Sequence, residues 1–555
     1  MSKKENSLNK RNVSYSMDYK LRFFKSPIVW LCTIGLIGLL IRIYFFPFEI
    51  PFTLDTLDYF GYAVLTNQLG QVPPEWPLAN NGWPIFVSTL FTFSSENFFD
   101  YIHIQRFTSV IISVLTIIPV YFLCKKFFNT TLSLIGSALF IFEPRILLNS
   151  VSGDTMSIFI LLTTTTVLLF IQKNDKLIFC AFVIAALATL IRYEALVLII
   201  PLSIMFFIKR EHTNKKIIKY FLGLGIFILI LIPLSYVGLE SSGSDGLISH
   251  YNAGTMYITS EVIEGVSYSE PGNLEIMDES WIQSNQNNLQ EFLFNMIENL
   301  SRFLVWIMIP TFMFFIPISI FIIFKEKYFK KIDHGVLSII IFSLFLLVPA
   351  FYAYGRNLEE SRYLFVIFPM LSMVSLIFIN KIQEKIDKKY LTTILLISLF
   401  LFLSIIGLNS KNLDVEYEHQ RETFHIVKFV VNNAEGINYF TPESQFVKSA
   451  EVSENWPNIP PRDPWGLGHL TRDLELFETS GYSSLEKFIV DHKDDGLTHL
   501  IVDGVYGRNQ ILNDVFFNEN EYIYLDKIYD SNDYDFKYHV KIFQINHKLL
   551  ENLSP

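Results

Sequence analysis

The stretch PIVWLCTIGLIGLLIRIYFF, residues 27–46, is followed after a short gap by IPFTLDTLDYFGYA, residues 50–63. The first stretch is apolar and long enough for a helix to cross ~30 Å of hydrocarbon, which takes roughly 20 residues. The second begins where that span ends and carries two carboxylates, Asp55 and Asp58, with no basic residue nearby. Because carboxylates are costly to keep at a membrane, this junction predicts a membrane protein that places acids at one face for a purpose.

The composition of the whole chain agrees with a membrane protein. Of its 555 residues 51% are hydrophobic and 16% are aromatic, which is too apolar for a soluble protein of several domains. The apolar runs recur from residue 28 to about 408, so the net charge of −10 is considered segment by segment and does not indicate nucleic-acid binding. Cys32, Cys124 and Cys180 lie in or beside apolar runs, which leaves no cysteine for disulfides outside the membrane.

We expect about eleven transmembrane helices. The segment 80–95 is apolar but too short to cross, so it is predicted to be a re-entrant or interfacial helix. No small-residue cleavage site follows the first run, which indicates an uncleaved signal anchor. The predicted spans are roughly 28–46, 103–123, 131–143, 154–171, 177–191, 195–208, 219–238, 303–324, 336–354, 363–379 and 391–408.

The basic residues predict which side of the membrane each loop occupies. Lysine and arginine crowd into the N-terminal tail and several short connections, whereas residues 47–105 and 239–301 contain none. By the positive-inside rule the tail, residues 1–27, is cytoplasmic, and the loops at about 47–102 and 239–301 lie outside. Eleven spans then place the C-terminus outside as well. The expected location is the cell membrane, with the membrane domain at residues 28–408.

After residue 408 the composition becomes that of a water-soluble domain. SSLEKFIVDHKDDGLTHLIVDG, residues 483–504, predicts an amphipathic helix, a glycine turn and a buried strand. YIYLDKIYDS and FKYHVKIFQIN, residues 522–531 and 536–546, alternate as strands do. The predicted fold class is therefore a polytopic α-helical membrane protein with a small C-terminal extracytoplasmic α/β domain, residues 409–555.

Ionisable residues at the ends of the predicted spans gather on the outer side, where they are candidates for function. Arginine suits a phosphate because its planar guanidinium stays charged, and an acid suits deprotonation of a hydroxyl or amide nucleophile. Together they predict chemistry on a phosphate-linked lipid at the outer face. The candidates are Asp55, Asp58, Arg106, Glu143, Arg145, Asp154, Arg192, Glu194, Arg356, Glu359, Glu360, Arg362 and Tyr363.

Each candidate also has a purely structural alternative, and their shared side of the membrane is what favours function. Asp58 and Glu143 could cap helices or face water, and the pair Glu359–Glu360 could belong to a solvated loop. The arginines could anchor to lipid phosphates. His103 is expected to be a packed or surface histidine, and NNGWP, residues 80–84, could be a turn before an interfacial tryptophan.

Four patches in this order resemble the GT-C superfamily of membrane glycosyltransferases, the polyprenyl-phosphate-sugar-dependent enzymes that include glycosyltransferase family 39. They are LDTLDYFGYA (54–63) with GWPIF (82–86), EPRILLNSVSGDTMSIFILL (143–162), LATLIRYEALVLIIP (187–201) and RYLFVIFPML (362–371). The resemblance covers about residues 28–408. The W-W-D-Y-G-type signature of oligosaccharyltransferase catalytic subunits is not found, which disfavours transfer of a whole oligosaccharide.

The resemblance implies that Asp55 is the catalytic aspartate of the first outer loop. The next residue is Thr56, so the family's usual Asp-Glu pair is absent and the identity of the acceptor stays open. It implies that Asp154 is the acid that opens the fourth span. It also matches Arg192 with Glu194, and Arg362 with Tyr363, to two family patches.

The activity expected from this resemblance is transfer of a sugar, with inversion, from a polyprenyl-phosphate carrier to a protein or glycolipid acceptor. Asp55 is the expected general base, and Arg362 the expected phosphate ligand, with Arg145, Arg192 and Arg106 as further candidates. A divalent cation, Mg²⁺ or Mn²⁺, stays open because no ligand spacing demands one.

The alternatives are a transporter or flippase, or an assembly subunit, for a polyprenyl-linked glycan. The ionisable residues favour the enzyme, because they gather at one face of the membrane, whereas alternating access places its charged residues near the midplane.

Overall fold

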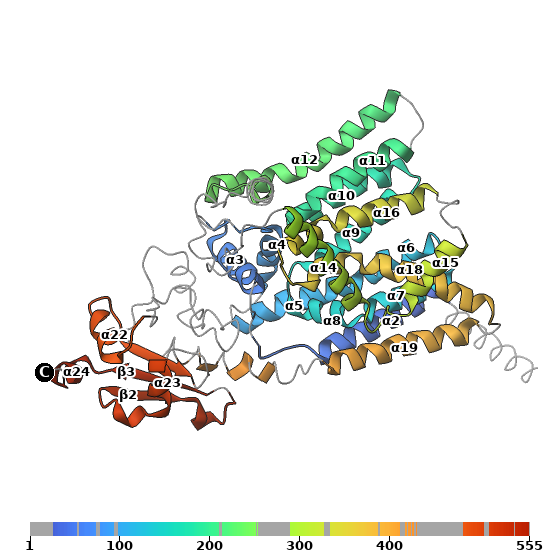
Figure 1. The fold of residues 1–555 in the computed structure, drawn as a ribbon. Helices are drawn as coiled ribbons and strands as arrows, with labels where there is room; N and C mark the ends of the chain where they lie inside the picture. The colour runs from blue at the N-terminus through green and yellow to red at the C-terminus, as the bar shows by residue number, and fades with distance from the viewer. Residues whose placement is uncertain are drawn as a thin grey trace, which may run out of the picture. The chain divides into compact units, whose positions relative to one another are not determined.

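The computed structural model of this chain is mostly helical and carries a small sheet near its C-terminus (Figure 1). It forms two compact units. Unit 1 comprises residues 1–46, 77–86 and 105–411, and unit 2 comprises residues 47–76, 87–104 and 412–555. The structure describes residues 26–50, 52, 55–73, 78–93, 98–209, 214–250, 252, 289–326, 333–386, 389–410, 417–418, 420–422, 425–426, 429, 481–503, 510–537 and 539–553. The predicted cytoplasmic tail and most of the second outer loop lie outside these residues.

Among the described residues of the region predicted to lie in the membrane, most are in α-helices, and two segments are 3₁₀-helix. The 3₁₀ segments are η1 (Tyr193–Leu198) and η5 (Ser361–Ile367). The α-helices are α2 (Pro27–Tyr44), α3 (Asp55–Leu69), α4 (Gly82–Phe91), α5 (Phe98–Leu115), α6 (Ile117–Lys125), α7 (Thr130–Ile141), α8 (Pro144–Ser152), α9 (Met156–Phe170), α10 (Asp175–Ile191), α11 (Ile199–Lys209), α12 (Asn214–Ser242), α14 (Leu289–Met308), α15 (Phe315–Lys325), α16 (His334–Leu346), α17 (Val348–Gly355), α18 (Phe368–Glu384) and α19 (Lys389–Asn409).

Fewer helices than the predicted eleven are long and apolar enough to cross a membrane alone. Among the described residues six meet this criterion, and a seventh is counted if α7 and α8, bent by 53°, form one span. The six are Pro27–Tyr44, Phe99–Lys125, Lys216–Ser241, His334–Gly355, Ser361–Glu384 and Tyr390–Asn409. The other predicted spans coincide with shorter helices, because the chain bends at positions such as Arg192 that apolarity alone does not mark. The segment predicted to be too short to cross contains α4, an apolar helix of 10 residues.

The outer faces of the helices are as apolar as their packed faces, as expected for contact with lipid. On α12, which packs along α10, the side chains of Ile217, Ile218, Phe221 and Leu222 are more than half exposed. Several hydroxyl side chains inside the bundle form hydrogen bonds with backbone carbonyls of their own helix. The hydroxyls of Ser137, Thr163 and Thr189, for example, donate to the carbonyl four residues earlier. These helices therefore keep their backbone and side-chain hydrogen bonds within the segment, which hydrocarbon requires.

A fully buried arginine on the first helix ties several helices of unit 1 together. Arg42 of α2 donates from Nε to the Ser150 hydroxyl of α8 (2.9 Å) and from Nη2 to the Ser113 hydroxyl of α5 (3.2 Å). Its Nη1 donates to the carbonyl of Ile141 at the end of α7 (3.2 Å). Removing this guanidinium would leave several buried acceptors without a donor, so we infer that it holds α8 in place.

The described C-terminal residues contain a three-stranded antiparallel sheet in the order β1 (His499–Asp503), β3 (Val540–Ile545), β2 (Leu525–Asp530). Its short helices are α22 (Leu485–Asp491), α23 (Gln510–Phe517) and α24 (His547–Leu553). The predicted helix, turn and strand over 483–504 and both later strands are present, which confirms the α/β class. The boundary at residue 409 stays a prediction.

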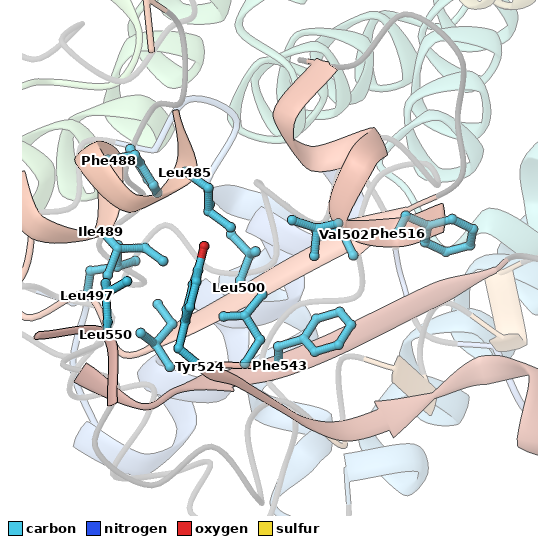
Figure 2. Close-up of a cluster of buried hydrophobic side chains, with 13 residues drawn as sticks. Leu485, Phe488, Ile489, Leu497, Leu500, Val502, Phe516, Tyr524, Phe543 and Leu550 are labelled. Carbon is cyan, nitrogen blue, oxygen red and sulfur yellow. The ribbon is translucent and has the colours of Figure 1, made fainter. Parts of the chain in front are cut away.

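The core of this sheet region lies between α22 and the sheet. Leu485, Phe488 and Ile489 of α22 are buried against a cluster that includes Leu500 of β1 and Phe543 of β3 (Figure 2). Along β3 the neighbours Ile542 and Phe543 are both buried, so the predicted alternation holds only in part. Because successive side chains point to opposite faces, both faces of this central strand are covered.

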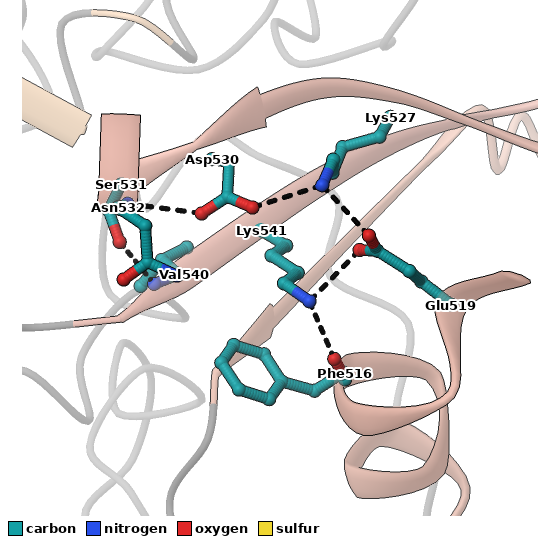
Figure 3. Close-up of polar contacts among 8 residues, drawn as sticks. All are labelled: Phe516, Glu519, Lys527, Asp530, Ser531, Asn532, Val540 and Lys541. Atoms are coloured by element: carbon teal, nitrogen blue, oxygen red, sulfur yellow. Dashed lines mark hydrogen bonds and ion pairs between the residues drawn. The ribbon is translucent and has the colours of Figure 1, made fainter. Parts of the chain in front are cut away.

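Polar contacts close the other end of the sheet region. Glu519 accepts from Lys527 of β2 and from Lys541 of β3, and both of these distances are 2.9 Å (Figure 3). Lys541 also donates to the carbonyl of Phe516 in α23 (2.8 Å). Glu519 thus links β2 to β3, and Lys541 links β3 to α23.

Candidate functional site

Two arginine–tyrosine pairs lie where regular α-helix stops. Arg192 ends α10 in an extended conformation, with φ −144° and ψ 117°, and Tyr193 begins η1. Arg362 and Tyr363 lie in the first turn of η5, which follows Glu360 in a similarly extended conformation. Because these residues are outside regular α-helix, their side chains are not restricted to a helix face that packs in the bundle.

Arg192 is held almost completely inside unit 1. Its Nη2 donates to Glu194 Oε1 (2.6 Å), and its Nη1 donates to the Thr155 hydroxyl at the start of α9 (3.0 Å). Both side chains of the ion pair are buried, with exposed fractions of 9% and 11%. The guanidinium carbon also lies 5.8 Å from the centre of the Phe159 ring. Arg192 therefore joins the end of α10 to the beginning of α9.

Arg362 is paired but more accessible. Its Nε forms an ion pair with Glu360, and its side chain is 28% exposed. The guanidinium lies over the ring of the adjacent Tyr363, 5.9 Å from the ring centre. Tyr363 in turn interacts electrostatically with Arg362 and Glu360, and also with Arg192 and Glu194. The two arginine pairs, far apart in sequence, therefore act on one tyrosine.

Asp154 lies on the turn between α8 and α9 and is buried. Its Oδ1 accepts the backbone N–H of Met156 (2.8 Å), and its Oδ2 accepts from the Asn149 amide (3.1 Å). It is also attracted by the charges of Arg362 and Arg192. These two hydrogen bonds fix the Asp154 carboxylate at the start of α9, next to Thr155, which accepts from Arg192.

Two residues of the NNGWP segment, together with Gln105, hold this part of the site in place. Gly153, with φ +81°, ends α8, and its carbonyl accepts from the Trp83 indole (3.3 Å) and the Gln105 amide (3.0 Å). Asn80, also from the NNGWP segment, accepts the backbone N–H of Tyr193 (2.9 Å). The sequence offered NNGWP as a possible turn before an interfacial tryptophan, and this pattern does not indicate which backbone groups Asn80 and Trp83 bind.

Glu143 and Arg145 are committed to packing. Arg145 Nη1 donates to Glu143 Oε1 (3.0 Å) and to the Ile309 carbonyl (2.6 Å), and its Nη2 donates to the Trp306 carbonyl (2.5 Å). Glu143 is fully buried at the N-cap of α8. This pair joins α8 to the end of α14, so Arg145 has few donors left for a ligand. Arg106, also in unit 1, is buried with 4% of its surface exposed.

The remaining candidates lie at helix ends and on loops. Asp55 and Asp58 form the first turn of α3 in unit 2, where the helix dipole favours negative charge. His103, also in unit 2, is hydrogen-bonded through Nε2 to the Phe48 carbonyl (2.8 Å) and packs edge-on against the Phe48 ring, as expected for a packed histidine. In unit 1, Glu359 pairs with Arg302 (2.8 Å).

Arg356 contacts a neighbouring tyrosine. It donates to the Tyr352 hydroxyl (3.2 Å) and lies over the Tyr352 ring, 5.5 Å from its centre. Within the described ranges, no group of three or more histidine, cysteine, aspartate or glutamate side chains is placed to hold a metal ion. The described residues therefore supply no ligand set through which a step with Mg²⁺ or Mn²⁺ could be derived.

Comparison with known proteins agrees with the resemblance seen in the sequence. Residues 84–236 match the family described as dolichyl-phosphate-mannose-protein mannosyltransferase. This matched segment contains Asp154, Arg192 and Glu194. The predicted GT-C resemblance is confirmed. The matched family is one of mannosyltransferases, which agrees with the predicted class of enzyme.

The solved structures of ArnT show the same fold. ArnT from Cupriavidus metallidurans bound to undecaprenyl phosphate aligns with a TM-score of 0.52 at 8% identity, over 93% of this chain and 97% of ArnT. Its apo state aligns with a TM-score of 0.52 at 8% identity, over 94% and 98%. The Archaeoglobus fulgidus oligosaccharyltransferase in complex with Zn and sulfate gives a TM-score of 0.48 at 13% identity over 80% of this chain, which spans 59% of its length. No curated protein matches the sequence.

Proposed function

We propose that this GT-C-type membrane protein transfers a sugar from a polyprenyl-phosphate carrier to an acceptor at the extracytoplasmic face. One arrangement carries the proposal. The segment η5, which bears Arg362 and Tyr363, packs against α9, and the N-cap of α9, Thr155, next to Asp154, accepts a hydrogen bond from Arg192. Two guanidinium groups near one point suit a phosphate, which each can bind through a planar fork of donors. The family match over residues 84–236 and the fold shared with a structure that holds undecaprenyl phosphate support a donor of this class.

The donor phosphate would exchange places with carboxylates that the arginines now bind. Arg362 has the more accessible ion pair, 28% exposed against 9% for Arg192, so its guanidinium can turn from Glu360 to a phosphate at lower cost. Arg192, fixed by Thr155 and Glu194, would supply a second, rigid positive charge. We propose Arg362 as the main phosphate ligand and Arg192 as its partner, and we give Arg145 a packing role.

The proposed reaction is a single displacement with inversion. The acceptor hydroxyl attacks the anomeric carbon, the bond from that carbon to the phosphate oxygen breaks, and the polyprenyl phosphate leaves as an anion stabilised by the arginines. The acceptor proton passes to Asp55, which the family resemblance assigns as the general base. Asp154 would orient the arginines, and Asp58, Glu194 and Tyr363 would support the site.

We also propose that the N-terminus lies in the cytoplasm and that the C-terminus lies on the extracytoplasmic side.

Transfer from a panel of polyprenyl-phosphate sugars, measured in detergent without any gradient, tests this proposal. General-base catalysis contributes about 10²–10⁴-fold. Asp55→Asn should therefore lose at least ~100-fold in rate while the protein remains monodisperse. Asp100→Asn is the matched control, since Asp100 is an exposed acid in the first turn of α5 in the same unit.

Three results would separate the alternatives. Near-normal transfer by the Asp55 variant would overturn the base assignment. Uptake or flipping that requires sealed vesicles, with no transfer in detergent, would point to a transporter. Mass spectrometry of surface glycans from cells with and without this protein would identify the sugar and acceptor, and identical glycans would count against a transferase.

A further inference from the structure

A groove at the end of the bundle opposite the arginine pairs is lined by side chains of α6, α9 and α10. Its walls are the apolar side chains of Phe122, Leu168, Leu169 and Leu177, and its volume is about 360 Å³. The groove is shallow and open at its surface, so it can hold one side of an apolar chain against these walls but does not enclose a ligand.

The mouth of the groove is basic. Lys125 and Lys126, at the C-terminal end of α6, belong to its lining. Lys125 donates to the Thr130 hydroxyl, and Lys126 Nζ lies 3.4 Å from the Gln172 amide oxygen. Both partners are neutral, and neither lysine pairs with a carboxylate in the part of the chain that the structure describes. Two adjacent positive charges thus lie beside an apolar groove.

The loop next to the groove adds to this positive charge. Lys173 is exposed between α9 and α10, and Lys176 is exposed in the first turn of α10. Asp175, the first residue of α10, pairs with Lys219 (2.6 Å). The local excess of lysine attracts anions, and the apolar walls exclude a freely soluble one.

We propose that this groove binds one phospholipid with an anionic headgroup, with its phosphate at Lys125 and Lys126 and part of an acyl chain between Phe122 and Leu169. The charge complementarity of the lysine pair selects the anionic headgroup, and the apolar walls select a lipid over a soluble phosphate. The sequence places this end of the bundle in the cytoplasm, where the inner leaflet supplies such lipids. The groove is separate from the proposed donor site and does not depend on the transferase activity.

Native mass spectrometry of the purified full chain tests the proposal, by titration with phosphatidylglycerol and with phosphatidylcholine of the same acyl chains. A lysine near a membrane surface contributes about 1 kcal/mol of attraction to anionic lipid, so losing two lowers affinity about 30-fold. K125S/K126S should therefore bind phosphatidylglycerol about 30-fold more weakly. K325S/K385S is the matched control, since it removes the same charge from two exposed lysines elsewhere and should bind as the parent does.

A second variant separates a defined groove from general attraction to the surface. Leu169→Trp fills the groove without changing charge and should also weaken the first binding event of phosphatidylglycerol. Soluble glycerol phosphate should not compete. The proposal is overturned if phosphatidylcholine binds equally well, if the control double variant loses as much affinity as K125S/K126S, or if Leu169→Trp binds as the parent does. Circular dichroism of each variant shows whether it is folded.

Discussion

The buried ion pair between Arg192 and Glu194 allows a quantitative test of how the candidate site is built. The two charged atoms are 2.6 Å apart, and about nine-tenths of each side chain is buried. Removing one partner of such a pair leaves an uncompensated buried charge, which costs about 3–5 kcal/mol. Arg192→Gln removes the positive charge that compensates Glu194 and that also attracts Asp154. We therefore expect it to lower the free energy of unfolding by an amount within this range.

Glu194→Gln and the double variant R192Q/E194Q complete a double-mutant cycle with Arg192→Gln. Glu194→Gln leaves Arg192 with its hydrogen bond to Thr155 and its attraction to Asp154, so a loss of about 1–3 kcal/mol is expected. In the double variant R192Q/E194Q no charge of the pair remains uncompensated. Its loss should be smaller than the sum of the single losses, with a coupling energy of about 2–3 kcal/mol.

The assay is unfolding in mixed micelles by titration with dodecyl sulfate, followed by circular dichroism. The matched control is the pair Arg302–Glu359, which has a similar separation of 2.8 Å but side chains that are 49% and 56% exposed. An exposed pair should show a coupling of about 0–1 kcal/mol. If the coupling of Arg192 with Glu194 is no larger than that of the control pair, then burial does not strengthen it and the proposed rigid charge at Arg192 is wrong.

Three further changes test other parts of the structure. Gly82→Ala would place a Cβ 2.3 Å from the Leu190 carbonyl oxygen, so it should lower the stability in detergent by about 1–3 kcal/mol, whereas Gly225→Ala, with open space around it, should not. Ile489→Ala, at a fully buried position, should cost about 2–5 kcal/mol, measured by hydrogen exchange of the sheet in the full chain. Burial opposes ionisation of Glu486, but hydrogen bonds from two hydroxyls outweigh it and lower its pKa. This stabilises the sheet region above the ordinary glutamate pKa and is lost as the pH falls, so Glu486→Gln should make hydrogen exchange there less sensitive to acid.

The sequence by itself determined the class of fold, because hydrophobicity is a local property that can be counted along the chain. Apolar runs from residue 28 to about 408 predicted the helices. After residue 480 a buried apolar run predicted β1, and alternating segments predicted β2 and β3. It also indicated Asp154, Arg192 and Arg362 as one group, since charge in apolar surroundings is costly and is retained where it has a use.

Only the tertiary structure decided which of those charges are available and what supports them. The sequence could not show that Arg145 gives its donors to Glu143 and to carbonyls at the end of α14. Nor could it show that Arg192 pairs with Glu194 in a buried setting, whereas Arg362 pairs with Glu360 where it is more exposed. It also could not show that Trp83 and Gln105 hold the turn before Asp154. The physical reason is that hydrogen bonds and ion pairs form between groups close in space, and residue spacing along the chain fixes such distances only within a single helix or turn.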